Sequence, residues 1–293
     1  MLTQAKLSRI AISKILLATD FSPESENALQ VALSLAKRYE SRLSITHAVP
    51  EEVYITAANI WPPMTDVARR NAETSMAHLE QREDLKTFPH EVVMQSGETW
   101  EVLAQVMFDR NIDLIVMGTH GHGGVNKLLL GSTAEKVVRH ATCPVFTVGP
   151  HVRLLSLNRF GNILYATDFS SGSLRALTYA LSLAEEDRAE LTMLHIIESK
   201  PASEPELLEW KRQDHERLSQ LIPPGVDLAY KPEIELEVGD PAEEILRLAA
   251  TRNADLIVMG SHLGGTVSTH LPWTTLHHVL QHAHCPVLTV RAA

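Results

Sequence analysis

The sequence predicts an α/β protein made of two copies of one domain, each a parallel sheet with helices on both faces. Its 293 residues suffice for about two domains of roughly 100–200 residues each. The segment Ala18–Ser22 recurs as Ala166–Ser170, and Asp113–Gly118 recurs as Asp255–Gly260. Within each copy, short apolar runs alternate with amphipathic helical patterns, which is typical of parallel α/β sheets.

The repeat also locates the domain boundary. Cys143-Pro144-Val145 recurs as Cys285-Pro286-Val287, so both copies extend to a short final strand. Turn residues between Gly149 and Asn158 separate the last strand pattern of one copy from the first of the next. We therefore expect domains at residues 1–150 and 158–293, called the first half and the second half below.

Both halves follow one order of elements. The strands expected in the first half are Ile15–Ala18, Leu43–Val49, His90–Met94, Leu114–Met117 and Pro144–Val148. The first expected helix has Ser22 as a favoured cap and Pro23 at its first position. Two further helices are expected over about Asp66–Leu85 and Trp100–Arg110, and a last one ends at His140. Residues 51–64 are expected to form an irregular loop.

The second half repeats this plan with six fewer residues between its second and third strands. Its expected strands are Ile163–Ala166, Leu191–Ile197, Ile234–Val238, Leu256–Met259 and Val287–Val290. Asp240-Pro241-x-Glu243 is a capping box that predicts the start of the helix before Asp255.

The most informative stretch runs from Asp113 to Thr133. An apolar run typical of a strand buried on both faces breaks at Gly118 into a glycine-rich loop, and a helical pattern resumes after Gly131. Ser132 or Thr133 is expected to cap that helix. Backbone N–H groups in such a loop and the helix dipole attract anions. The alternative is an ordinary surface loop.

The spacing Gly118-x2-Gly121-x9-Gly131-Ser132 closely resembles the nucleotide-binding signature of the universal stress protein family. The resemblance covers nearly the whole chain, twice. It implies two Rossmann-like domains, of the type found in adenine nucleotide alpha-hydrolases, each with five parallel strands in the order 3-2-1-4-5. Strands 1 and 4 would then be neighbours at the switch point where ligands bind, so Asp20 and Gly118 would face one crevice.

The resemblance implies ATP, or AMP or ADP, in the first half, with or without Mg²⁺. The implied binding residues are Asp20 near ribose, phosphate or metal, and His47 and Ala48 at adenine. Met117 would pack on the sugar or base, and Lys127 would reach phosphate. The remaining residues, at ribose and phosphates, are Gly118, Gly121, Gly131, Ser132 and Thr133. Several of these have a structural alternative. Asp20 could cap the following turn, His47 and Met117 could be packing residues, and Lys127 could be solvated.

The second half is expected to lack this site. Aligning Gly260 with Gly118 replaces Gly121 by Leu263, Gly131 by Trp273 and Ser132 by Thr274. The alternative is a shifted loop that uses Gly264 and Gly265 to accept a smaller ligand.

No catalytic residue and no metal ligand is assigned from the sequence. His120-Gly121-His122 only partly matches the His-x-Gly-His motif of nucleotidyl transferases. His278 and His282 have a spacing that suits a metal, but a solvated helix face is the preferred interpretation. We therefore expect a regulatory nucleotide-binding protein, in which slow ATP hydrolysis could accompany binding. The alternatives are a nucleotide-independent interaction module and an ATP-using transferase.

Composition limits the partners. A net charge of -10 argues against nucleic acids and anionic membranes, and no apolar run approaches the roughly 18 residues that span a bilayer. With two cysteines and no clear signal-peptide cleavage site, a cytoplasmic location is expected. A regulatory protein partner is expected but not identified. The apolar final strands of the two halves are expected to pair antiparallel as an intrachain pseudo-dimer, and a homodimer of whole chains is left open.

Overall fold

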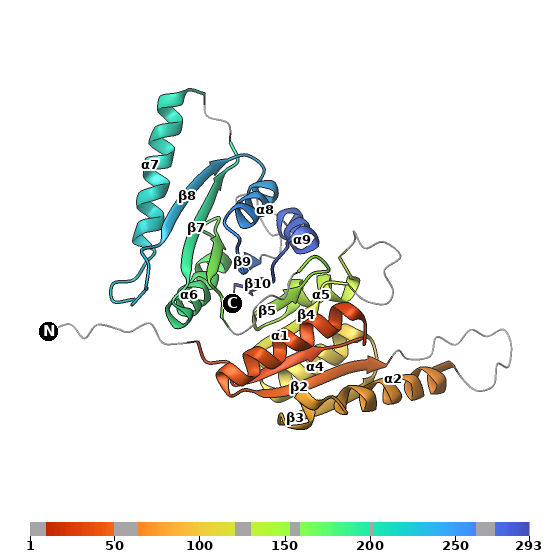
Figure 1. The fold of residues 1–293 in the computed structure, drawn as a ribbon. Helices are drawn as coiled ribbons and strands as arrows, with labels where there is room; N and C mark the ends of the chain where they lie inside the picture. Colours follow the sequence, from red (N-terminus) through yellow and green to blue (C-terminus); the bar gives the residue numbers. More distant parts are fainter. Residues whose placement is uncertain are drawn as a thin grey trace, which may run out of the picture.

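The computed structural model describes residues 10–49, 64–120, 130–152, 159–199, 202–261 and 273–292. Within these ranges the strands form one ten-stranded sheet in the order β3-β2-β1-β4-β5-β10-β9-β6-β7-β8 (Figure 1). Each half therefore has the strand order 3-2-1-4-5, and the two halves meet at their fifth strands. The fold class predicted from the sequence is confirmed.

The first half supplies the strands and helices at one end of this sheet. Its strands are β1 (Lys14–Ala18), β2 (Arg42–Val49), β3 (His90–Ser96), β4 (Leu114–Gly118) and β5 (Val145–Val148). Its helices are α1 (Pro23–Tyr39), α2 (Met64–Glu80), α3 (Glu83–Lys86), α4 (Thr99–Arg110) and α5 (Ser132–His140).

The second half repeats the arrangement. Its strands are β6 (Asn162–Ala166), β7 (Glu190–Ile197), β8 (Glu233–Val238), β9 (Leu256–Ser261) and β10 (Val287–Arg291). Its helices are α6 (Ser171–Asp187), α7 (Glu204–Gln220), α8 (Pro241–Thr251) and α9 (Trp273–His282). As predicted, the Asp240 side chain caps α8 by accepting hydrogen bonds from the N–H groups of Ala242 and Glu243.

Helices cover both faces of the sheet and enclose two hydrophobic cores. Leu114 and Val116 of β4 point into the core that contains α1, α2, α6 and α7 side chains. Ile115 and Met117 point into the other core, which contains side chains of α4, α5, α8 and α9. The unbroken apolar run of β4 is therefore explained by burial on both faces.

Two local predictions were wrong. The single helix expected over Asp66–Leu85 is two helices, because Arg82 adopts an extended backbone conformation between α2 and α3. Its guanidinium group binds Glu26 on α1 and Asp84, a tertiary contact that the helical pattern did not reveal. The cap of α5 is Gly131 instead of Ser132 or Thr133, and Ser132 is the first helical residue.

The two halves pair within the chain through β5 and β10, which run antiparallel with Leu288 opposite Phe146. The hydroxyl of Thr147 donates to the Val287 carbonyl at 3.0 Å, and that of Thr289 donates to the Val145 carbonyl at 3.3 Å. Each half alone would expose its fifth strand as an unpaired sheet edge, which favours aggregation. The pairing of β5 with β10 covers both edges.

A cluster of charged side chains joins the halves on the α1 and α6 side of the sheet. The Arg38 guanidinium donates to Asp187 at 2.8 Å and to Glu186 at 3.0 Å, and the Tyr39 hydroxyl donates to Glu186 at 2.7 Å. Asp187 also accepts from the Phe160 N–H at 2.9 Å. The charged groups are largely buried, with side-chain exposures of 18% for Arg38, 13% for Glu186 and 3% for Asp187.

Neither cysteine is expected to react in the folded protein. Cys143 and Cys285 are free and buried, and burial raises the pKa of each thiol to about 12. At pH 8 almost no thiolate is present, so iodoacetamide should label neither residue, although both should react in denaturant. Mass spectrometry of tryptic peptides measures how much of each cysteine is labelled. Rapid labelling of the native protein, or a disulfide between the two, would contradict the arrangement.

Candidate functional site

The carboxyl ends of β1 and β4 meet where the strand order reverses. Ala18 of β1 lies opposite Met117 of β4, so Asp20, which follows β1, and Gly118, the last residue of β4, lie at the same edge of the sheet. The Asp20 side chain accepts a hydrogen bond from the Ser22 N–H at 3.1 Å. Asp20 therefore shapes the turn into α1.

Gly131 is attached to the same edge through Thr119. Its N–H donates to the Thr119 carbonyl at 2.8 Å, and the Thr119 N–H donates to the Val148 carbonyl at 3.0 Å. A Cβ at Gly131 would lie 3.2 Å from the Thr119 carbonyl oxygen, which is tighter than ordinary contact. Gly131 therefore approaches the end of β4 most easily because it has no side chain.

The start of α5 differs from those of the long helices that carry their own caps. The side chains of Ser22, Glu98, Ser170, Ser203 and Asp240 each accept a hydrogen bond from the first turn of their helix. Gly131 has no side chain and supplies no such acceptor to α5. The first-turn N–H groups, which begin at Ser132 and Thr133, can therefore bind an external anion with the helix dipole behind them.

Gly118 has a packing role in the structure. A Cβ added there would lie 3.2–3.3 Å from the backbone and Cβ of Glu24, in the first turn of α1. The residue thus allows β4 to approach α1 closely. Met117 is only 4% exposed and lies in the core beside α4 and α5, so the packing role considered for it in the sequence is present.

His47 is also held as a packing residue. Its Nδ1 atom lies 2.8 Å from the Thr19 carbonyl oxygen, and its ring contacts that of Phe21 at a centroid distance of 4.6 Å. His195 makes the same two contacts with Thr167 and Phe169 in the second half. Ala48 follows His47 near the end of β2 and is half-buried. Gly121, Lys127 and Leu263 lie outside the described residues.

The Thr-Asp-Phe-Ser turn has the same geometry in both halves. Phe21 and Phe169 adopt left-handed backbone conformations with φ angles of 63° and 60°, which bulky residues rarely adopt. In the first half, the Phe21 N–H donates to the Thr19 hydroxyl at 3.1 Å and the Ser25 N–H donates to the Ser22 hydroxyl at 3.2 Å. The recurrence of the segment in the sequence indicates a shared turn, but the hydrogen bonds of its hydroxyl groups are visible only in the structure.

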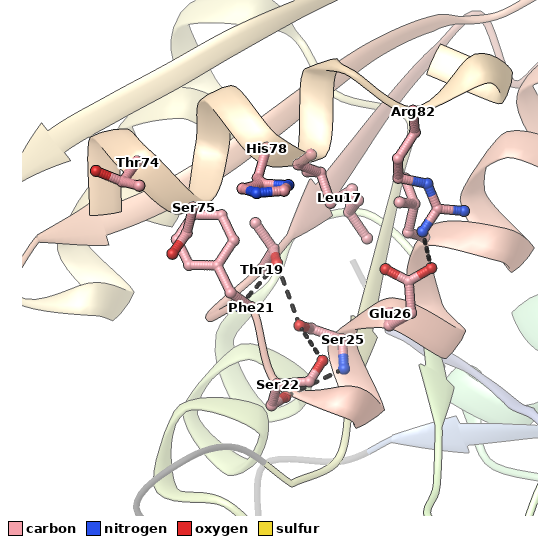
Figure 2. Close-up of a pocket in the computed structure, with 12 residues that line it drawn as sticks. Leu17, Thr19, Phe21, Ser22, Ser25, Glu26, Thr74, Ser75, His78 and Arg82 are labelled. Carbon is pink, nitrogen blue, oxygen red and sulfur yellow. Dashed lines mark hydrogen bonds and ion pairs between the residues drawn. The ribbon is translucent and has the colours of Figure 1, made fainter. Parts of the chain in front are cut away.

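A cavity of about 420 Å³ lies beside this turn, between α1 and α2 (Figure 2). Leu17, Phe21 and Leu29 contribute apolar surface, and Ser22 and Ser25 contribute hydroxyl groups. None of the described residues that were predicted to bind nucleotide lines it. The cavity therefore adjoins the turn on either side of Asp20 but does not include Asp20, Gly118 or Gly131 in its lining.

Two histidines near the end of the chain lie against each other on α9. The rings of His278 and His282 stack at 4.3 Å, and the His282 Nδ1 lies 2.9 Å from the His278 carbonyl oxygen. Burial lowers the pKa of the neighbouring His277. In the part of the chain that the structure describes, no group of three or more His, Cys, Asp or Glu residues could hold a metal ion. No helix in the same residues has the length and apolar character needed to cross a bilayer.

Comparisons with known proteins agree with the repeat. The model of the universal stress protein family matches residues 11–149 and 159–291. A universal stress protein of Mycolicibacterium smegmatis is 26% identical over 292 residues, covering 94% of this chain and 96% of its own. One from Thermus aquaticus is 35% identical over 136 residues, covering 46% of this chain and 96% of its own. The crystal structure of a universal stress protein from Archaeoglobus fulgidus shares the fold, with a TM-score of 0.69, 22% identity and 96% coverage of both chains.

Proposed function

The chain belongs to the universal stress protein family, and on that premise we propose that its first half binds ATP or a related adenine nucleotide. The observation that carries the proposal is the start of α5 at the switch point of the sheet. There, Gly131 leaves the first-turn N–H groups without a cap from its own position, beside the turn that contains Asp20. This combination is suited to a phosphate group.

The residues of the first half fit such a ligand. Ser132 and Thr133 would offer backbone N–H groups to the phosphates, while Gly131 keeps side-chain atoms out of their path. Asp20 would face ribose or a phosphate-bound Mg²⁺, and Ala48 lies on the adjacent strand where adenine is expected. Gly121 and Lys127 would complete the loop. A bound Mg²⁺ would neutralise phosphate charge.

We further propose that the second half does not bind nucleotide. The turn at Asp168 is kept, because its carboxylate accepts from the Ser170 N–H at 3.0 Å. However, α9 begins with Trp273 at the repeat position of Gly131. A tryptophan introduces a large side chain where the first half has none. The chain would then hold one nucleotide, and its occupancy would regulate a protein partner in a cytoplasmic stress response.

Calorimetric titration of the whole chain with MgATP is expected to give a stoichiometry near one. Gly131→Val should weaken binding at least about tenfold, equivalent to about 1.4 kcal/mol, because side-chain atoms would enter the phosphate position. Ser132→Ala is the matched control, since it removes a hydroxyl but retains the backbone N–H, and should bind much more nearly like wild type.

The outcomes also separate the alternatives. Two equivalent sites would contradict the proposed loss in the second half. Unchanged affinity in Gly131→Val, with wild-type melting, would contradict the site, and no binding by the wild-type protein would favour a nucleotide-independent interaction module. Rapid turnover with transfer to an acceptor, identified by product analysis, would instead indicate a transferase.

A further inference from the structure

The cavity between α1 and α2 lies on a different side of the β1 end from the proposed nucleotide site. Leu17 and Thr19 of the β1 end line the cavity, whereas Asp20 does not. Leu29 of α1 and Leu79 of α2 contribute to its apolar walls. Figure 2 shows Phe21 and Ser75 at one end of this space and the Arg82–Glu26 pair at the other. With a volume of about 420 Å³, it falls in the range of small-molecule sites.

The second half fills the corresponding space with one of its own side chains. Tyr165 of β6 occupies the repeat position of Leu17 and is 0% exposed. Its hydroxyl donates to the Ser173 carbonyl at 2.8 Å, and Ser173 is the repeat equivalent of Ser25, which lines the cavity. The phenol ring therefore reaches from the sheet to the first turn of α6 across the space that Leu17 leaves open in the first half.

The helix above this space also differs between the halves. In the second half, the guanidinium carbon of Arg217 on α7 lies 3.7 Å from the centroid of the Phe169 ring. The Asp214 Oδ2 atom lies 3.7 Å from the His195 Nε2 atom. In the first half, the cavity beside Phe21 is bordered by Thr74, Ser75 and His78 of α2. The two halves share the turn and its hydroxyl network. The cavity in the first half therefore results from sequence differences at a few surrounding positions.

We propose that this first-half cavity binds a small neutral phenol, positioned as the Tyr165 side chain is in the second half. The ring would lie against Leu17, Phe21 and Leu29, and its hydroxyl would donate to the Ser25 carbonyl. This carbonyl already accepts within α1, but a carbonyl oxygen has two lone pairs, and the Ser173 carbonyl accepts from Tyr165 at the same helical position.

The charges around the cavity favour a neutral ligand. Arg82 lines the cavity, and its guanidinium group is bound to both Glu26 and Asp84. An added anion would have to compete with these two carboxylates. A phenol that keeps its proton satisfies the hydrogen-bonding geometry and buries its ring without introducing a charge.

The probe that tests the proposal is p-cresol, which has the structure of the tyrosine side chain. In a methyl NMR titration of the full wild-type chain, the Leu17 and Leu29 signals should shift, while those of Leu16 and Met117, which face the other core, should not. Benzoate, a charged ring of similar size, should bind at least about tenfold more weakly. Absence of a p-cresol response at Leu17 and Leu29 would overturn the proposal.

Two exchanges between the halves provide matched variants. Leu17→Tyr should fill the cavity and weaken p-cresol binding at least about tenfold, without changing MgATP affinity. Tyr165→Leu should open the second cavity and raise the stoichiometry of p-cresol from one to two. Unchanged p-cresol binding by folded Leu17→Tyr would overturn the site, and a stoichiometry of one in folded Tyr165→Leu would overturn the role of Tyr165. Because p-cresol binding is measured without nucleotide, its result is independent of the proposed ATP site.

Discussion

Gly260→Ala is expected to destabilise the protein by about 3 kcal/mol or more, at the upper end of overpacking effects. A Cβ at Gly260 would lie 2.3 Å from the Ser173 nitrogen, 2.6 Å from the Gly172 carbonyl carbon and 2.7 Å from the Ser173 Cα. All three are backbone atoms in the first turn of α6. They cannot rotate away as a side chain would, so β9 and α6 would have to separate. Urea denaturation followed by circular dichroism measures the loss.

Gly118→Ala is the control for this prediction, because it is the same substitution at the equivalent position of the first half. Its nearest contacts, with Glu24, are 3.2 Å or longer and require shifts of only a few tenths of an ångström. We expect a cost of about 1 kcal/mol or less, partly offset by the lower entropy of the unfolded chain. Equal effects of the two substitutions would show that close packing at Gly260 is not decisive.

Arg38→Gln is expected to destabilise the pairing of the halves by about 3 kcal/mol, as when one partner of a buried ion pair is removed. The substitution would leave Glu186 and the 3%-exposed Asp187 close together without their shared cation. The Phe160 N–H would still bind Asp187, but it cannot compensate a full charge. The midpoint of thermal unfolding should fall accordingly.

Arg69→Gln serves as the exposed counterpart. Arg69 pairs with Glu73 along α2, and both side chains are more than half exposed, at 56% and 57%. Such surface pairs contribute about 0–1 kcal/mol, so this variant should melt almost like wild type. Exchanging the charges in the double variant Arg38→Glu with Glu186→Arg should recover part of the lost stability. Equal melting of Arg38→Gln and Arg69→Gln would refute the importance of the buried cluster.

Much of the fold could be predicted because its signals are local and occur twice. The apolar run of β4 and its copy in β9 identify strands buried on both faces, and the final strands identify the edges that pair. The break between α2 and α3 was missed because it depends on Arg82 reaching Glu26, which is 56 positions away in the sequence. The spacing of apolar residues within 66–85 carries no information about such a contact.

The candidate site was only partly accessible to sequence reasoning. The glycine spacing indicated where α5 begins, but not that Gly131 itself is the cap, because this depends on its hydrogen bond to Thr119. The cavity beside Phe21 was missed for a different reason. The difference between Leu17 and Tyr165 is visible in the aligned repeats, but its meaning depends on the three-dimensional contact between Tyr165 and Ser173.

The contact between Arg38 and Glu186 has a consequence for how a tandem protein can evolve. In a dimer of identical subunits, a residue beside the two-fold axis meets its own copy, so a charge there would repel itself. Arg38 and Glu186 occupy the same place in the two repeats and still meet as opposite charges. Joining the copies in one chain removes the requirement for self-complementarity. The surface of each half can therefore be complementary to the other half without being complementary to a second copy of itself. In the same way, one half can lose a ligand site while the other retains its own.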